Sequence, residues 1–333
     1  MAREISITTK VIFEYLDKWP NVPNLTLARK IYKENPESFT GIEHVRAIIR
    51  TYKGRSGKNL REEIKYRKYF DDSELYKNPY QLPDSEAEDD TVFTIPPQYN
   101  KIGLMADMHI PYHDVEAMTV AIDHFINFGA NAIIIDGDAV DFYSLSRFNK
   151  DPRNRDVSYE LDCLANVIKT LKQNFGKVFY KKGNHEERYE RYLRIKAPEL
   201  LNVSEFQYEN LLAQRGVNCE VIPHTKIMAG KLPVIHGHEF QSASTSIVNP
   251  ARGLMLKGYT HGIVAHAHRS SQHTEKDLMG KLLVCFSVGC LCGLSPEWAR
   301  LNKWNHGIAT IELEESGAFD VENLRIHKGR IRK

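Results

Sequence analysis

Carboxylate and imidazole side chains recur in five short groups between residues 107 and 268. Side chains two positions apart in an extended segment point the same way, so a carboxylate and an imidazole at this spacing can meet one cation. Such donors suit Mn, Fe or Zn, and the lack of a cysteine ligand disfavours a structural zinc site. The groups are Asp107-Met108-His109, Gly137-Asp138-Ala139-Val140-Asp141, Gly183-Asn184-His185-Glu186, His236-Gly237-His238 and His266-Ala267-His268.

Each group directly follows a short apolar run that predicts a strand. Amphipathic stretches at Val115–Phe128 and Val157–Phe175 predict helices between them, so an α/β sheet is expected. One Asp or His at a strand end is more often a cap or a buried structural group. Five groups at five strand ends, where sites gather in such sheets, instead predict a metal centre. The predicted strands are Lys101–Ala106, Ala132–Asp136, Val178–Lys181, Leu232–Ile235 and Gly262–Ala265, with a late antiparallel edge pair at Gly307–Leu313 and Phe319–Ile326.

The composition is that of a soluble globular protein. The chain has 333 residues, 42% of them hydrophobic and 26% charged. No apolar run approaches the roughly 20 residues of a membrane helix, and the first residues lack the apolar core of a signal peptide. The five cysteines form no disulfide framework, which favours a reducing interior. We therefore expect a cytoplasmic protein that has no membrane partner.

The formal net charge of +2 hides a strong asymmetry along the chain. Residues 1–70 carry 15 basic and 8 acidic side chains, whereas residues 71–100 carry 1 basic and 8 acidic side chains. The acidic segment also contains prolines and few aliphatic residues, so it cannot bury much apolar surface. We predict a basic helical domain at 1–70, an acidic linker at 71–100 and a catalytic domain at 101–333.

Three short helices are predicted in the basic domain, from apolar residues at helical spacing and from the prolines that interrupt them. Thr40 and Glu43 predict a capping box at the start of the third helix. Arg46, Arg50 and Lys53 lie on the polar face of this helix. A trihelical unit with a basic last helix is typical of a helix-turn-helix reader of DNA, with contacts mainly to phosphates. The alternative is a solvated basic face on a docking or assembly module.

The order of the five groups resembles the calcineurin-like metallophosphoesterase superfamily, and the layout is similar to that of members from bacteriophages and bacteria. The resemblance covers most of residues 101–270. It implies a two-sheet α/β/β/α sandwich, preceded here by the small trihelical domain. It also implies hydrolysis of phosphoesters by a hydroxide that two divalent metal ions activate. Mn is the expected metal, with Fe, Zn or Ni as alternatives.

The same resemblance implies a role for each site residue. His185 corresponds to a histidine that is not a ligand and that protonates or stabilises the leaving oxygen, and Asp141 corresponds to the carboxylate that orients it. Asp138 would bridge the two metals. The ligands of one metal would be Asp107, His109, Asp138 and His268, and those of the other Asp138, Asn184, His236 and His266.

Departures from the family pattern bear on the substrate. Phe142 stands where Ser/Thr phosphatases of this superfamily carry an arginine that helps to bind the phosphoryl group, so a phosphoprotein substrate is disfavoured. Arg188 and Arg191 follow the third group, one helical turn apart, and could contact a nucleic acid backbone. A solvated, ion-paired helix face is the alternative for these two arginines.

The expected substrate is therefore a phosphodiester bond of nucleic acid. Two alternatives stay open: a phosphatase or phosphodiesterase of small nucleotides, and a DNA-binding or assembly module whose metal site is structural. A phage-encoded protein would act in the cytoplasm of its host. The sequence does not indicate an oligomeric state.

Overall fold

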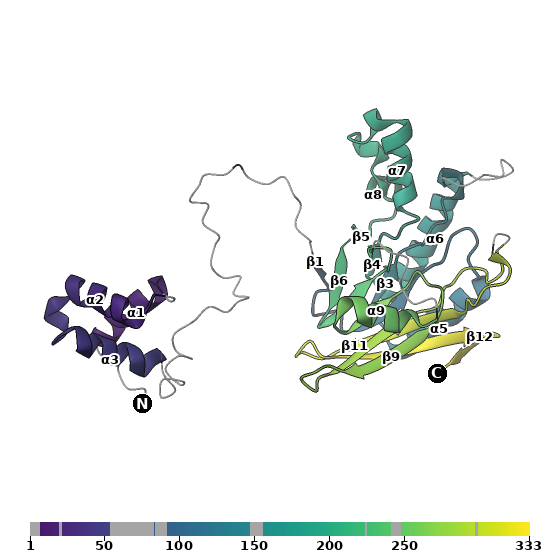
Figure 1. The fold of residues 1–333 in the computed structure, drawn as a ribbon. Coiled ribbons are helices and arrows are strands. Elements are labelled where there is room, and N and C mark those ends of the chain that lie inside the picture. Colours follow the sequence, from purple (N-terminus) through teal and green to yellow (C-terminus); the bar gives the residue numbers. More distant parts are fainter. Residues whose placement is uncertain are drawn as a thin grey trace. The chain divides into compact units, whose positions relative to one another are not determined.

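The computed structural model describes residues 7–19, 22–53, 83, 92–146, 156–223, 225–240, 248–296 and 299–333. The chain forms two compact units, Met1–Ala87 and Glu88–Lys333, and Figure 1 shows the fold of each. Most of the expected acidic linker lies outside the described residues. Its described end is part of the second unit, because Val92–Thr94 form strand β1 and Ile95 is buried in that unit's core.

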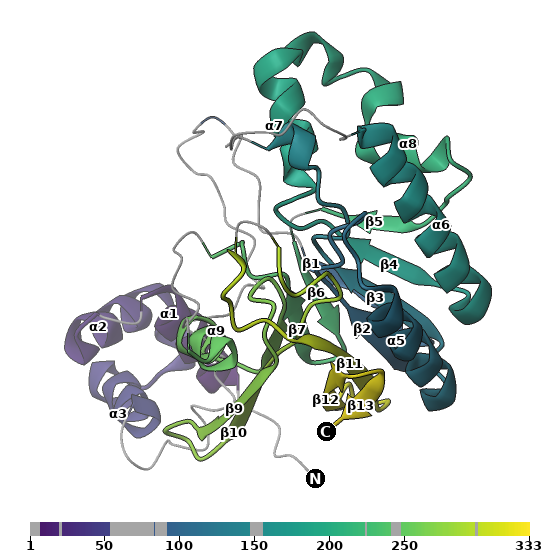
Figure 2. The same ribbon diagram turned by 90° about the vertical axis from the view of Figure 1, so that its right-hand side faces the viewer.

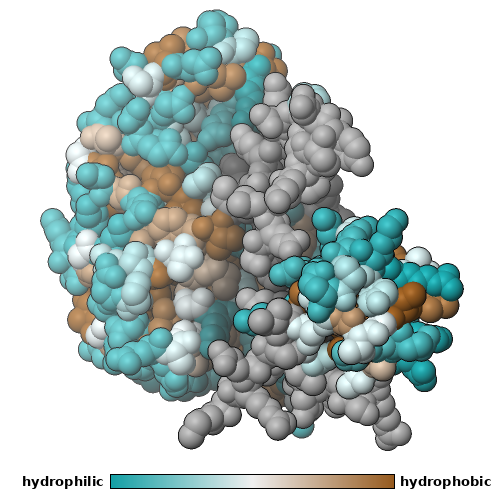
Figure 3. Space-filling view, turned by 90° about the vertical axis from the view of Figure 1, so that its left-hand side faces the viewer, coloured by the Kyte–Doolittle hydropathy of each residue, from teal (hydrophilic) through white to brown (hydrophobic). Residues whose placement is uncertain are grey.

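Three α-helices lie in the described part of the first unit, as the apolar spacing predicts. They are α1 (Ile7–Lys18), α2 (Asn24–Glu34) and α3 (Ile42–Lys53). Their apolar faces meet in one cluster, while the face of this unit turned to the viewer in Figure 3 is mostly hydrophilic. The buried members of the cluster are Ile12, Leu16, Leu27, Ala28, Ile31, Phe39, Val45 and Ile49.

The predicted capping box at the start of α3 does not form. The amide and the hydroxyl group of Thr40 lie 3.3 Å and 3.0 Å from Nδ1 of His44. Glu43 instead pairs with Arg46 at 3.2 Å, one turn further along the exposed face. The His44 imidazole thus accepts the hydrogen bond from the Thr40 amide that the Glu43 carboxylate was expected to accept.

The second unit contains two packed sheets. The larger has the strand order β13-β12-β11-β2-β3-β4-β5. Strands β2 (Lys101–Met105), β3 (Ala132–Asp136), β4 (Val178–Lys181) and β5 (Glu220–Ile222) run parallel. Strands β11 (His306–Leu313), β12 (Phe319–His327) and β13 (Arg330–Arg332) continue the sheet in antiparallel fashion.

The two late strands pair in antiparallel fashion as predicted, but the prediction that they form the edge of the sheet is wrong. Strand β11 lies inside the sheet, because it pairs with β2 on one side and with β12 on the other. The chain then turns at Lys328 and Gly329, both with positive φ, and β13 becomes the edge.

The smaller sheet has the order β1-β6-β7-β8-β10-β9. Strands β7 and β8 run parallel, and β10 runs parallel to β8. Helix α9 (Pro250–Gly258) packs against β8, β9 and β10 (Figure 2). The other bounds are β6 (Lys226–Ala229), β7 (Leu232–Ile235), β8 (Gly262–Val264), β9 (Ser271–Lys276) and β10 (Leu282–Ser287).

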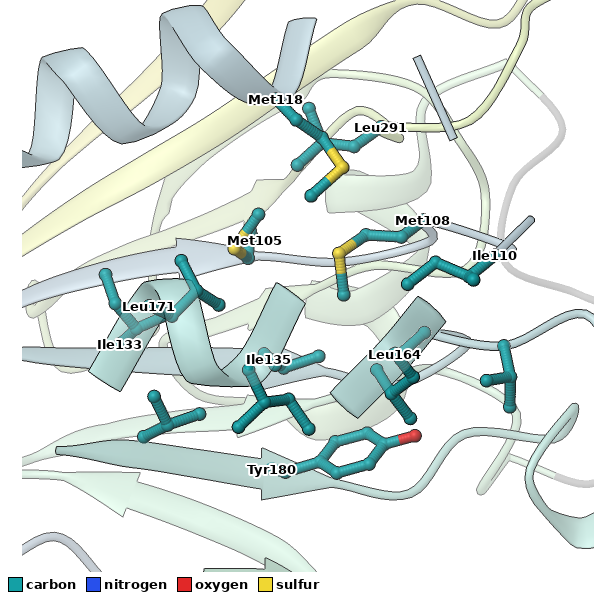
Figure 4. Packing of buried hydrophobic residues seen from close by; sticks show 14 of the residues in the cluster. Met105, Met108, Ile110, Met118, Ile133, Ile135, Leu164, Leu171, Tyr180 and Leu291 are labelled. Carbon is teal, nitrogen blue, oxygen red and sulfur yellow. The ribbon is translucent and has the colours of Figure 1, made fainter. Parts of the chain in front are cut away.

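Alternate residues of the central strands face two different cores. Ile102 and Ile134 belong to the cluster between the sheets, together with Ile227, Val234 and Ile263 of the smaller sheet. The residues between them face helices α5 (Val115–Phe128) and α6 (Val157–Phe175) on the other side of the larger sheet. Figure 4 shows this second cluster, in which Met105, Ile133, Ile135, Leu164 and Leu171 pack together. The α/β/β/α sandwich is therefore confirmed.

Further helices lie beyond the carboxyl end of β4. They are α7 (Glu187–Lys196) and α8 (Tyr208–Ala213). Among the described residues, no helix is both long and apolar enough to cross a membrane.

Truncating a core residue of the first unit tests whether its cluster is independent of the second. Ile49→Ala removes a fully buried side chain and should destabilise the first unit by about 2–5 kcal/mol. Hydrogen exchange should accelerate in α1–α3 and stay unchanged in β2 and β3, because the clusters share no residue. The exposed Thr51→Ala on α3 is the control. Faster exchange in β2 and β3 would contradict independent cores.

Candidate metal centre

The predicted site groups meet at one edge of the sandwich because their strands are neighbours. β2, β3 and β4 lie side by side and parallel, so the groups that follow them emerge at the same edge. Hydrogen bonds continue beyond the strands: the Asp107 amide donates to the Gly137 carbonyl (3.1 Å) and the His109 amide to the Asp138 carbonyl (3.0 Å). The groups after β7 and β8 come from the facing sheet.

The backbone is left-handed at several site residues that are not glycine. This conformation is uncommon for residues with a Cβ, and it collects at functional sites where surrounding structure enforces it. Here it turns the chain sharply after β2, β3 and β8 and aims the side chains at a common centre. The site residues with positive φ are Asp107, His109, Asp138, His266 and His268.

Two carboxylates lie at the centre of the cluster. Oδ1 of Asp107 lies 3.2 Å from Nε2 of His268 and 4.0 Å from Nε2 of both His109 and His236. Oδ2 of Asp138 lies 3.3 Å from Nε2 of His236 and 3.9 Å from Nε2 of His109. These residues form groups whose donor atoms lie within 4.8 Å of one another: Asp107, His109 and Asp138 in one, and Asp138, His236 and His266 in another.

The donor atoms have the properties expected of cation ligands. Among the described residues, several buried oxygen and nitrogen atoms make no hydrogen bond, although buried polar atoms normally do. A divalent cation would satisfy such lone pairs, and neutral imidazole with carboxylate is a suitable donor set. The atoms are Oδ1 of Asp107, Oδ1 of Asn184, Nε2 of His236 and Nδ1 of His266.

Electrostatics keeps the carboxylates charged and one imidazole neutral. Burial raises the pKa of Asp107 and Asp138, but histidines outweigh it, chiefly His268 at Asp107 and His185 at Asp138, so both values are lowered. Burial, together with the neighbouring His236, lowers the pKa of His266 to about 4. These are the protonation states that metal ligands need. Despite burial, the carboxylates also raise the pKa of His236 and raise that of His268 to about 10, so both imidazoles would release a proton on binding a cation.

Asp141 bonds two neighbouring histidines, His109 through its carboxylate and His185 through its carbonyl oxygen. Its Oδ1 lies 3.2 Å from Nδ1 of His109 and 3.3 Å from Nδ1 of His185. The hydrogen bond of His185 goes to the Asp141 carbonyl oxygen instead, at 2.8 Å from Nδ1. Nε2 of His185 consequently faces the carboxylates and lies 3.8 Å from Oδ2 of Asp138.

The side chain of Glu186 holds together the loops that follow β3 and β4. Its buried carboxylate accepts hydrogen bonds from four amides of the second and third groups and from one phenol. This carboxylate therefore fixes the backbone that carries Asp138 and His185. The donors are the amides of Asp138 (3.0 Å), Ala139 (2.8 Å), Val140 (3.3 Å) and Gly183 (2.7 Å) and the hydroxyl group of Tyr180 (2.7 Å).

A second carboxylate, which is partly buried, holds the loop after β7. Glu239 accepts hydrogen bonds from the amides of His236 (3.0 Å) and Gly237 (2.5 Å) and pairs with the buried Lys181. Burial raises the pKa of Glu239, but Lys181 outweighs it and lowers the value to about 2. Nδ1 of His236 lies 2.6 Å from the Asp136 carbonyl oxygen, which fixes the ring.

Glycines are required where the loops touch. At Gly183 a Cβ would lie 2.5 Å from the Asp138 nitrogen, so no side chain fits without moving the backbone. Gly137 has φ +80°, and its Cβ would lie 2.5 Å from Nδ1 of His236. The loops can approach this closely only because both positions lack a side chain.

Sequence reasoning missed two residues beside His268. Sγ of Cys292 lies 3.9 Å from Nδ1 of His268, and the Trp304 ring packs edge-on against the imidazole at 4.1 Å. Cys292 follows β10, which runs parallel to β8 and ends at the same edge. The apolar run before Cys290 and Cys292 is the signal that could have located them.

The residues predicted to contact nucleic acid lie on two helices, one in each unit. Arg46, Arg50 and Lys53 lie on α3 of the first unit. Arg188 and Arg191 both lie on α7, but only Arg188 reaches the centre, where Nη1 donates to the Asp141 carbonyl oxygen. Arg191 is exposed. The basic loop at residues 147–155 lies outside the described residues.

Comparison with known proteins identifies the family. Residues 100–289 match the model of the calcineurin-like phosphoesterases. The chain therefore belongs to the calcineurin-like phosphoesterase family, whose name describes the hydrolysis of phosphoesters. It is 28% identical over 176 residues to the Gene 54 protein of Mycobacterium phage L5, a match that covers 51% of this chain and 69% of that protein.

The chain also resembles solved structures at low sequence identity. Vacuolar Protein Sorting 29 from Cryptosporidium parvum is 13% identical, and the match covers 70% of this chain and 94% of that chain with a TM-score of 0.40. A dimetal phosphatase from Danio rerio is also 13% identical, with 68% and 96% coverage and a TM-score of 0.35.

Replacing the Glu186 carboxylate tests its organising role. Glu186→Gln replaces one accepting oxygen with an NH2 group, which cannot accept hydrogen bonds from the loop amides. The substitution should lower the free energy of unfolding by about 2–4 kcal/mol. Affinity for Mn²⁺ should fall as well, because the loops carrying Asp138 and Asn184 lose their common acceptor. Denaturant unfolding and calorimetric Mn²⁺ titration measure the two effects. The exposed Glu199→Gln should change neither, and a Glu186→Gln variant with native stability would refute the role.

Proposed function

We propose that this chain hydrolyses phosphodiester bonds of nucleic acid, using two divalent metal ions at the centre described above. The observation that carries the proposal is the buried convergence of carboxylates and imidazoles beside His185, with donor atoms that lack hydrogen bonds. Mn is the proposed metal, because the donors are a mixture of oxygen and imidazole nitrogen. The ligands would be Asp107, His109, Asp138 and His268 for one ion, and Asp138, Asn184, His236 and His266 for the other.

When bound, the ions supply Lewis acidity that polarises the phosphoester and lowers the pKa of water. The chain supplies the remaining functions. His185 faces the centre through Nε2 while the Asp141 carbonyl oxygen holds Nδ1. A ring held in this way can donate a proton from Nε2 to a leaving oxygen. Asp141 orients both His185 and His109.

The first unit supports a nucleic acid substrate. Arg46 and Arg50 lie on one side of α3, away from the buried Val45 and Ile49. Helix α3 packs with α1 and α2 around one small core, an arrangement that helix-turn-helix readers share. The similarity to a phage protein supports action in the cytoplasm of a host cell.

His185→Ala should abolish the proton donor without removing a ligand. We expect kcat to fall about 10²- to 10⁴-fold, while Mn²⁺ affinity and stoichiometry are retained. The substrates are an aryl phosphomonoester, an aryl phosphodiester, single- and double-stranded DNA and RNA, each with Mn, Zn, Ni or Mg.

The same measurement separates the candidate functions. Turnover of the diester and of nucleic acid, lost in His185→Ala, supports the proposal. Turnover of the monoester or of small nucleotides alone would assign a small-phosphoester phosphatase. No turnover with any metal would leave a binding or assembly module with a structural metal site.

The double variant Arg46→Gln/Arg50→Gln tests the role of α3. If both side chains contact phosphates, the slope of log affinity against log salt for duplex DNA should decrease in magnitude by about 2. Fluorescence anisotropy at several salt concentrations measures this slope. Lys30→Gln, which removes a charge that pairs with Glu34 on α2, is the matched control. An unchanged slope in the double variant would exclude α3 as the DNA contact.

A further inference from the structure

The side chain of Arg188 turns from helix α7 into the centre. Nη1 donates to the Asp141 carbonyl oxygen at 2.8 Å, and Nη2 lies 2.8 Å from Nε2 of His185. A guanidinium group only donates, so this second contact uses the lone pair of the imidazole. Arg188 therefore occupies the side of His185 that faces the reacting groups.

Arg188 lacks a direct counter-ion, unlike Arg194 and Arg215 of the same unit. Among the described residues, no carboxylate lies within 4.0 Å of its guanidinium, whereas Arg194 pairs with Glu190 at 3.7 Å and Arg215 with Asp162 at 2.6 Å. Burial lowers the pKa of the Arg188 guanidinium, although carboxylates at longer range, chiefly Asp141 and Asp138, attract its charge, and the group remains charged at neutral pH. A half-buried cation whose hydrogen-bond partners are a carbonyl oxygen and an imidazole nitrogen is well suited to an anion.

Phe142 explains why the cation comes from α7. Its backbone is left-handed (φ 44°), its amide donates to Glu160 (2.6 Å), and its ring is buried near Tyr189 and Tyr208. The chain therefore carries no positive charge directly after Asp141. Arg188 of α7 instead donates to the Asp141 carbonyl oxygen and places a guanidinium group beside that residue.

We propose that Arg188 binds a non-bridging oxygen of the substrate's phosphoryl group. The inference rests on the proposed function, because it assumes a phosphoester at this centre. Nη1 stays on the Asp141 carbonyl oxygen, while Nη2 exchanges His185 for the phosphoryl oxygen. The exchange frees Nε2 of His185 to take up a proton from solvent, which it can then donate to the leaving oxygen. The planar fork of arginine suits this geometry, because its two nitrogens can bond different acceptors at once.

A purely structural role would be different. Arg188 could serve only to hold the loop that carries Asp141 and His185. Arg188→Gln separates the roles, because glutamine retains amide donors for the Asp141 carbonyl oxygen but carries no charge. Arg188→Met, which retains an apolar stem, is the second variant. Arg194→Gln on the exposed face of α7 is the matched control.

The experiment is calorimetric titration of the Mn²⁺-supplied protein with inorganic phosphate. We expect the Kd for phosphate to rise about 10- to 100-fold in Arg188→Gln and Arg188→Met and to stay unchanged in Arg194→Gln. With an aryl phosphodiester substrate, KM and the inhibition constant of phosphate should rise by similar factors. Native phosphate affinity in whichever Arg188 variant has a native circular dichroism spectrum would overturn the proposal, as would a wild-type protein that does not bind phosphate.

Phosphate binding does not require turnover, so the two proposals can fail separately. A wild-type protein that binds phosphate through Arg188 but hydrolyses no ester would retain this anion site and refute the proposed hydrolase. A wild-type protein that hydrolyses esters, with variants that lose kcat but keep native phosphate affinity, would make Arg188 a positioning residue for His185.

Discussion

The architecture of this protein depends on holding two buried carboxylates among several imidazoles at distances of 3.2 to 4.0 Å. Burial alone would neutralise Asp107 and Asp138, yet the histidines keep the pKa of both carboxyl groups low. No short segment of chain can bring such groups together, because a cluster of this kind needs several backbone turns that approach one another closely. The parallel strands β2, β3 and β4 and the facing strands β7 and β8 provide those turns.

The loops need support that the strands do not provide. Glu186 and Glu239 are acidic residues beside the predicted ligands, and each accepts hydrogen bonds from backbone amides of the loops that carry those residues. The lack of a side chain at Gly137 and Gly183 lets these loops touch. The centre therefore contains carboxylates of two kinds. Asp107 and Asp138 face the site, whereas Glu186 and Glu239, which follow His185 and His236 closely in the sequence, bond to the backbone of the loops.

Much of the fold could be predicted, because strand ends and helical periodicity are local signals. Val115–Phe128 and Val157–Phe175 are helices with those bounds, and the two-sheet sandwich is confirmed. Features that depend on tertiary partners could not be predicted. His44 replaces Glu43 as the partner of Thr40, and β11 lies inside a sheet. Cys292 reaches His268 from the segment after β10, which carries no recognised motif. The spacing of Arg188 and Arg191 suggested a shared face, but one guanidinium turns inward and the other side chain is exposed.

The separation of the site residues along the chain has a consequence for folding. His109 and His268 approach to 3.1 Å, although 159 positions separate them in the sequence. Contacts of this range form late, because the loop between them must close before the contact contributes free energy. A cation bound there acts as a ligand of the native state alone, and its binding free energy adds to the stability of the whole second unit. A nascent or partly folded chain presents only fragments of the donor set, so it cannot sequester metal ions tightly before both sheets have docked.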